Sequence, residues 1–98
     1  MEKTTRMRLR RQGSLNEVLV LVRHPMQGAG GGLAEGDCIE KLSCRCNGAA
    51  VAEVYTGANV AENPLFMLAV DEVCSGDLLE VCWRDNRGDR GEAALLVS

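Results

Sequence analysis

Aromatic residues and histidine are scarce in this chain. Of its 98 residues only Tyr55, Phe66 and Trp83 are aromatic, and His24 is the single histidine. A hydrophobic core must therefore be built from aliphatic side chains, methionine and cysteine. Acid–base and nucleophilic catalysis need a base within reach of an acid or a nucleophile, and one imidazole supports at most one such site. The scarcity favours a non-catalytic module that serves another molecule.

Long apolar segments and excess basic charge are missing too. No segment reaches the roughly 18 apolar residues of a membrane-spanning helix, and residues 1–14 are too polar for the apolar part of a signal peptide. The net charge is −3, so neither a membrane nor a nucleic acid is expected as a partner. This start of the chain predicts the cytoplasm, export by another route, or prior removal of a signal.

Short apolar segments separated by turn residues dominate the sequence. The aliphatic segment 18–22 is soon followed by Pro25, which has no N–H for a sheet, and Asn47-Gly48 is typical of a two-residue hairpin turn. Strands are expected over residues 6–11, 17–24, 38–46, 50–55, 65–70, 78–84 and 93–97, although 50–55 could also be helical. The pattern predicts an all-β, immunoglobulin-like β-sandwich of about seven antiparallel strands, in a single domain over residues 1–98.

Two of the expected strands, 18–22 and 65–70, are apolar on both faces. Successive side chains of a strand point to opposite faces, and a two-sheet sandwich covers only the inner face of each sheet. The outer faces should then expose aliphatic surface, which usually marks an interface. We therefore expect an obligate partner, and self-association of the chain when that partner is absent.

The first expected strand carries three alternating arginines, Arg6, Arg8 and Arg10. Their spacing places them on one face of the strand. They could protect an edge strand against unwanted pairing, or they could form a basic contact strip for an acidic partner.

An ordered set of motifs resembles one protein family. The motifs are His24-Pro25-Met26 with Gly28, then Ile39, Cys44, Asn47-Gly48, Asn63-Pro64, Ser75-Gly76, Leu79, Trp83, Asp85 and Gly88. Over about residues 6–97 the chain resembles SoxZ, the Z subunit of the bacterial sulfur-oxidation (Sox) thiosulfate carrier. It departs from that family in its five cysteines, its glycine content over 28–32, and Leu65, where an aromatic residue is common.

The resemblance implies a fold and a role. SoxZ-like proteins are immunoglobulin-like sandwiches that pair with SoxY, whose glycine-rich C-terminal arm carries the sulfur intermediate on a cysteine. They have no catalytic residues and no cofactor, and they help present that arm to other Sox enzymes in the periplasm. Such a subunit is typically exported with its signal-bearing partner. We expect partner contacts at His24, Pro25, Met26 and Gly28, and at Asn63 with Pro64.

The cysteines leave other interpretations open. They are Cys38, Cys44, Cys46, Cys74 and Cys82. They could pack in the core, or Cys82 could form a disulfide with Cys44 or Cys46 if their strands are neighbours. Metal binding lacks the usual Cys-x-x-Cys spacing, and a redox role would fall to Cys38. The alternative function is a small redox or metal-binding protein on the same frame.

Three further motifs have two interpretations each. Residues 28–32 are expected to form a flexible loop, which could pack beside the partner's arm, rather than a nucleotide site, because no helix follows the glycines. Arg87-Gly88-Asp89 is either a polar turn or an adhesive tripeptide. His24 either caps loop carbonyls through its ring N–H groups or contacts the partner, whereas Trp83 is expected in the core.

Overall fold

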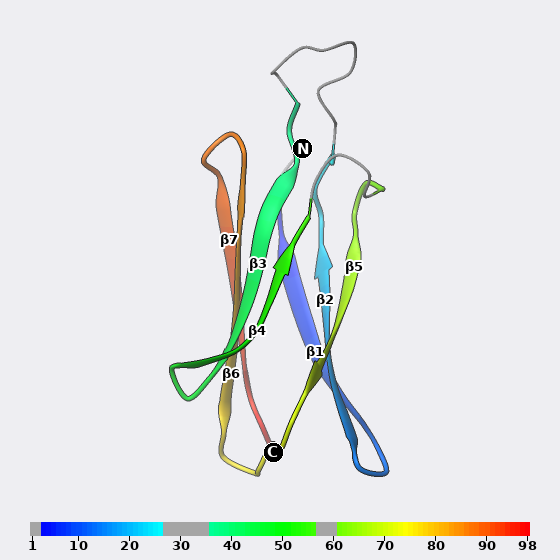
Figure 1. The fold of residues 1–98 in the computed structure, drawn as a ribbon, viewed down its shortest axis with the longest axis vertical. Helices are drawn as coiled ribbons and strands as arrows, with labels where there is room; N and C mark the ends of the chain where they lie inside the picture. The colour runs from blue at the N-terminus through cyan, green and yellow to red at the C-terminus, as the bar shows by residue number, and fades with distance from the viewer. Residues whose placement is uncertain (1–2, 27–35, 57–60) are drawn as a thin grey trace.

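The computed structural model describes residues 3–26, 36–56 and 61–98, which form seven strands in two antiparallel sheets (Figure 1). The three-stranded sheet has the order β1 (Thr5–Gln12), β2 (Leu15–Val22), β5 (Leu65–Val70). The four-stranded sheet has the order β4 (Ala49–Tyr55), β3 (Ile39–Cys46), β6 (Leu78–Asp85), β7 (Arg90–Leu96). This arrangement confirms the predicted all-β, immunoglobulin-like sandwich. Among the described residues no helix is long and apolar enough to cross a membrane.

All seven predicted strands are present, and only their ends differ from expectation. The second strand ends at Val22, not at His24, and the last begins at Arg90, not at Ala93. The helical alternative for residues 50–55 is wrong. Asn47 and Gly48 adopt positive φ angles of 52° and 87°, the geometry of a tight hairpin turn, which returns the chain as β4 alongside β3.

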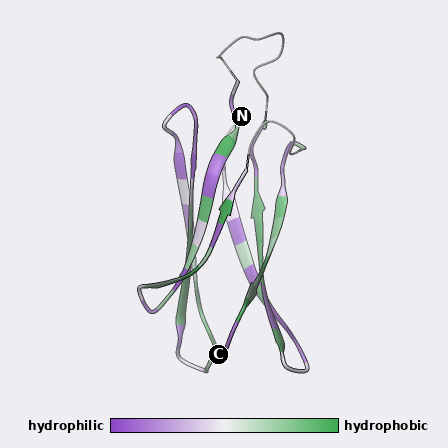
Figure 2. Ribbon diagram, in the orientation of Figure 1, coloured by the Kyte–Doolittle hydropathy of each residue, from purple (hydrophilic) through white to green (hydrophobic). Residues whose placement is uncertain are grey.

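The core lies between the sheets and is built almost entirely from aliphatic side chains. On β2, Val18, Val20 and Val22 are fully buried, while Leu21 between them is 45% exposed. Figure 2 shows the hydrophobic character of β2 and β5 beside the alternating pattern of β1. Trp83 is 1% exposed, so the predicted core position of this residue is confirmed.

Trp83 limits the size of the side chain at position 91 on the neighbouring strand β7. Its indole crosses Gly91 of β7, where an added Cβ would lie 2.3 Å from the indole Nε1. The same Nε1 donates a hydrogen bond to Thr5 Oγ1 at 2.8 Å. Glycine at position 91 therefore lets the indole bridge both sheets.

Candidate functional site

The predicted partner-binding residues gather at the end of the sandwich where β2 stops and β5 begins. Asn63 N donates to the His24 carbonyl at 2.8 Å, and His24 N donates to Asn63 Oδ1 at 3.0 Å. One residue on, the Pro64 carbonyl accepts a bond from Val22 N at 3.1 Å. Asn63 adopts φ 51°, a left-handed conformation that asparagine tolerates well. These bonds hold the two segments together.

Burial separates the predicted partner-binding residues into two groups. The side chains of His24, Met26 and Pro64 are buried, that of Pro25 is half-buried, and that of Asn63 is exposed. Only Pro25 and Asn63 can therefore present a side chain to another molecule without rearrangement. A partner-binding role for these residues remains a prediction.

Gly28, and the remainder of the predicted 28–32 loop, lie outside the described residues.

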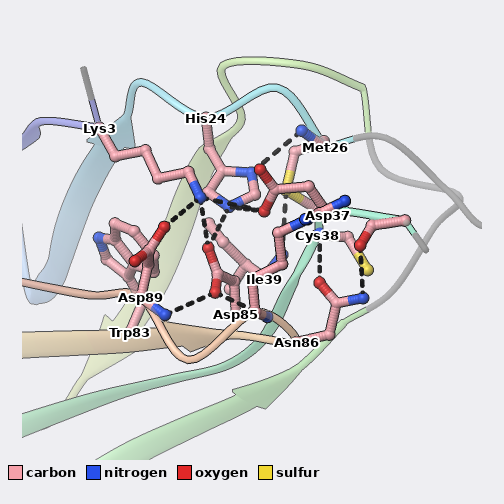
Figure 3. Close-up of polar contacts among 12 residues, drawn as sticks. Lys3, His24, Met26, Asp37, Cys38, Ile39, Trp83, Asp85, Asn86 and Asp89 are labelled. Atoms are coloured by element: carbon pink, nitrogen blue, oxygen red, sulfur yellow. Dashed lines mark hydrogen bonds and ion pairs between the residues drawn. The ribbon is translucent and has the colours of Figure 1, made fainter. Parts of the chain in front are cut away.

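His24 is the centre of a buried polar cluster at this end (Figure 3). Its Nδ1 accepts a hydrogen bond from Met26 N at 3.0 Å, and its Nε2 lies 2.9 Å from Asp85 Oδ2. A backbone N–H can only donate, so Nδ1 carries no proton and Nε2 carries the proton of a neutral ring. The ring meets Trp83 edge to face, with centroids 5.4 Å apart.

The expected capping role of His24 was wrong in its direction. The ring accepts from a loop N–H and donates to a carboxylate, and no loop carbonyl receives a bond from it in the described part of the chain. The reason is that the chain after His24 turns so that the N–H of Met26 lies 3.0 Å from Nδ1. The sulfur of Met26 in turn accepts a bond from Ile39 N at 3.3 Å.

Lys3 ties the start of the chain to this cluster. Its Nζ lies 3.0 Å from Asp37 Oδ1, 2.8 Å from Asp85 Oδ2 and 2.6 Å from Asp89 Oδ2. The three carboxylates come from the residues before β3, the end of β6 and the β6–β7 turn. Sequence reasoning missed this cage. The only signal was the pair of aspartates flanking the turn at Gly88, which says nothing about Lys3.

The electrostatics of the cage favour its ionised form. Burial alone would raise the pKa of Asp85, but hydrogen bonds from Lys3, His24 and the backbone N–H groups of Asp89 and Arg87 outweigh it. They lower the pKa of Asp85 from 3.8 to about 2. For Lys3, burial opposes the charge, yet the bonds to the three carboxylates raise its pKa well above the usual value.

Three of these groups are near enough to one another to be considered as metal ligands. The donor atoms of His24, Asp37 and Asp85 all lie within 4.8 Å of each other. However, the Lys3 ammonium already contacts both carboxylates, and Nε2 carries the ring proton. Metal binding through Nε2 would move that proton to Nδ1, where it would face the N–H of Met26. The cluster fits an internal ion-pair network better than a metal site.

The five cysteines are all free thiols. Strands β3 and β6 are neighbours, as expected, but Cys82 stands opposite Ser43 and is exposed on the outer face. Cys44 is buried and Cys46 packs against the core from the same side. A disulfide from Cys82 to either of them is therefore wrong, because residues of opposite parity on a strand face opposite sides.

Three of the thiols are disfavoured as nucleophiles. Burial raises the pKa values of Cys38, Cys44 and Cys46, and the carboxylates of Glu40 and Asp37 add to the effect at Cys38. Since the thiolate is the reactive form, a raised pKa weakens the redox interpretation of Cys38.

The Arg87-Gly88-Asp89 motif forms the β6–β7 turn. Gly88 has φ 87°, and the Arg87 and Asp89 N–H groups both donate to Asp85 Oδ1, at 3.0 and 2.8 Å. The Asp89 carboxylate is held by Lys3. These contacts support the turn interpretation over the adhesive one.

The outer face of the three-stranded sheet exposes a cluster of apolar side chains. Leu19 and Leu21 of β2 stand beside Met67 and Leu65 of β5, and we name these four residues the apolar patch. Leu21, Leu65 and Met67 are 45%, 56% and 59% exposed. Exposed aliphatic surface on the second and fifth strands was predicted, and the structure confirms it.

Arginines border the apolar patch along the edge strand β1. Arg6 is in register with Leu21, and Arg8 with Leu19. A shallow hollow lined in part by Arg6, Leu21 and Asn63 makes the patch continuous with the His24–Asn63 end of the molecule. The exposed face and the predicted partner-binding end are thus parts of one surface.

Comparison with known proteins adds a family. No curated protein matches the chain. A family model described as "Sulphur oxidation protein SoxZ" matches residues 5–95, nearly the whole sequence and all seven strands apart from the last residue of β7. The chain therefore belongs to the SoxZ family of sulfur-oxidation proteins.

Proposed function

We propose that this protein is the non-catalytic subunit of a periplasmic carrier of thiosulfate-derived sulfur. It binds and stabilises a SoxY-like protein and helps present the sulfur-bearing C-terminal arm of that partner to other Sox enzymes. Membership of the SoxZ family supports the setting in sulfur oxidation, and the surface of the protein supports the binding role.

The observation that carries the proposal is the exposed apolar patch. Leu21, Leu65 and Met67 are about half exposed on a regular sheet, and contact between these apolar side chains and water is unfavourable. Covering apolar surface is favourable by roughly 25 cal/mol per Å². A stable complex buries about 800 Å² of each partner. This area is larger than the surface of the four side chains of the apolar patch, so the partner would also cover the borders of the patch.

One border of the patch is the predicted partner-binding end. Pro25 and Asn63 offer side chains there, and Gly28 follows Pro25 closely in the sequence. The side chains of His24, Met26 and Pro64 are buried and contribute indirectly, because the hydrogen bonds of these residues hold the backbone of the same segments in place. In this proposal the partner's arm leaves the complex beside this end of the sandwich.

The chemistry of the buried groups favours binding over catalysis. Both ring nitrogens of His24 are engaged within the protein, and three of the five thiols have raised pKa values. A base, an acid or a nucleophile would need to leave these contacts before it could meet a substrate.

Co-expression with a SoxY-like protein that retains its C-terminal arm tests the proposal. Size-exclusion chromatography with mass detection should show a stable one-to-one complex. Separate elution of the two chains contradicts the proposal. A stoichiometric metal or a reproducible thiol–disulfide cycle in the isolated chain would favour the alternative of a redox or metal-binding protein.

The periplasmic location is tested separately by cell fractionation. We expect the chain in the periplasm when its signal-bearing partner is co-expressed, and in the cytoplasm when the signal is deleted from that partner. Export that is independent of the partner would contradict this part of the proposal.

A further inference from the structure

The outer face of the three-stranded sheet consists of three parallel rows of side chains. Register places Arg6, Leu21 and Leu65 side by side across the sheet, and Arg8, Leu19 and Met67 in the next row of neighbours. Read along the strands, β1 contributes arginines, while β2 and β5 contribute the apolar patch. One line of basic side chains thus lies beside two lines of apolar side chains, and both kinds are accessible from the same side.

Counter-charges for the arginines are missing on this face. Arg10 pairs with Glu17, the one acidic residue facing outward on these three strands. Within residues 3–26, 36–56 and 61–98, neither Arg6 nor Arg8 forms an ion pair. The described part of the chain therefore supplies no counter-charge to these two guanidinium groups, which stand beside the leucines of the apolar patch.

Protection of an edge strand explains only part of this arrangement. Strand β1 is an edge of the sheet, and charged side chains on an edge discourage unwanted pairing. That role requires no exposed apolar surface next to the charges. The same arginines also line a hollow together with Leu19, Leu21 and Leu65, and arginine beside apolar residues is typical of protein interfaces.

A second copy of this chain fits the face poorly. A twofold contact of the face with itself would bring two sets of unpaired arginines together and supply no carboxylate beyond the two Glu17 side chains already used. A contact onto the opposite sheet of another copy would be heterologous, and such contacts form open filaments unless the rotation closes a ring. Charge therefore favours a different protein.

We infer that the face docks an apolar surface of the SoxY-like partner that is bordered by carboxylates, with Arg6 and Arg8 pairing with those carboxylates and the apolar patch covered. This inference rests on the proposed function and names the surface that the function uses. Charge complementarity of this kind raises the association rate and makes binding depend on salt.

Affinity measurements on the co-expressed complex test the inference through two pairs of substitutions. The first pair is Leu65→Thr with Met67→Thr, which removes apolar surface and keeps a residue suited to strands. The second is Arg6→Glu with Arg8→Glu. We expect each pair to raise the Kd by at least about 30-fold, and the charge reversal to abolish the weakening of the parent complex by salt.

Matched controls lie on the outer face of the four-stranded sheet. Tyr55 of β4 is 71% exposed there, and Arg45 is an exposed arginine of β3. Tyr55→Thr and Arg45→Glu should change the Kd by less than about threefold. Circular dichroism and the Tm establish that each variant is folded before its affinity is compared.

A footprint on the unmodified complex removes the dependence on variants. Hydroxyl-radical oxidation of Met67, which is 59% exposed in the isolated chain, should fall severalfold in the complex, whereas oxidation of Tyr55 on β4 should not change.

The outcomes separate the inference from the proposed function. If a stable complex forms, but the substitutions on this face leave its Kd unchanged and Met67 is oxidised as fast in the complex as in the isolated chain, the inference is overturned and the proposed function is unaffected. Failure of the parent proteins to associate removes both. Dimerisation that persists when the SoxY-like protein is added, and that is lost in Leu65→Thr/Met67→Thr, identifies a second copy as the occupant and overturns the inference.

Discussion

The polar end of the sandwich and the outer face of its three-stranded sheet differ in whether their side chains find partners within the chain. At the polar end Lys3 contacts three carboxylates, and both nitrogens of His24 and both oxygens of Asp85 are engaged. On the outer face the apolar patch is open to water, and Arg6 and Arg8 lack ion pairs among the described residues. The contacts of the first region stabilise the fold, whereas we propose that the second serves association.

The other outer face supports this contrast. On the four-stranded sheet Lys41 pairs with Glu53 at 3.5 Å and also lies over the Tyr55 ring, 5.6 Å from its centroid. Its exposed large aliphatic residues are Val51 on β4 and the neighbouring Leu78 and Leu96 on β6 and β7, a smaller group than the apolar patch, and some exposed apolar surface is normal on a protein. The proposed function accounts for the difference between the two outer faces, because it assigns only the face of the three-stranded sheet to the partner.

The largest effect is expected from removing the buried carboxylate of the polar end. Asp85→Ala leaves Lys3, His24 and two backbone N–H groups without their acceptor. Loss of one member of such a buried network costs about 3–5 kcal/mol. Urea unfolding should show this loss. The control, Asp89→Ala, removes a carboxylate that is 59% exposed and should cost under about 1 kcal/mol; equal losses would remove the distinction.

A somewhat smaller loss of stability is expected from adding a side chain at Gly91, beside the buried indole of Trp83. Gly91→Ala would place a Cβ 2.3 Å from Trp83 Nε1 and 2.6 Å from Thr5 Oγ1. Because the indole is buried between the sheets, relief requires backbone movement, at a cost of about 1–3 kcal/mol. Tryptophan fluorescence during denaturation measures it. Adding Trp83→Phe should recover part of the cost in a double-mutant cycle, and strict additivity would contradict the contact.

Acid should weaken the polar end to a similar extent. The pKa of Asp85 is lowered from 3.8 to about 2 in the folded protein, so the folded state binds fewer protons than the unfolded state. This contribution to stability is present above pH 3.8 and is lost as the pH falls toward 2, and it amounts to about 2 kcal/mol. The free energy of unfolding, measured above pH 3.8 and near pH 2, should fall less on acidification for Asp85→Asn than for the parent protein. Identical decreases would argue against Asp85 as the group responsible.

The smallest effect is expected on the exposed face. Leu65→Thr and Met67→Thr should each change the free energy of unfolding by no more than about 0.5 kcal/mol, because both side chains already contact water. Leu68→Ala on the same strand removes a side chain that is 6% exposed and should cost about 2–5 kcal/mol. Thermal or urea denaturation compares the three. A large loss at Leu65 or Met67 would mean that the face stabilises the chain itself.

Local pattern was enough for the strands and their faces. The period of two along Val18 to Val22 predicted that the valines and the leucines face opposite sides, and Asn47-Gly48 predicted the hairpin, because both depend on neighbours along the chain. The Cys82 disulfide and the direction of the His24 hydrogen bonds were wrong. Each depends on register across strands or on a loop's backbone angles, which spacing along the sequence does not specify.

Local sequence specified the seven strands, the segments that are apolar on both faces and the likeness to one family, because hydrophobic periodicity and turn chemistry depend on residues that are close together along the chain. Only the tertiary structure brings Lys3 to Asp85, which are 82 positions apart, and sets Arg6 beside Leu21 and Leu65. Such contacts arise when two twisted sheets pack in one register, and that packing is a property of the whole chain.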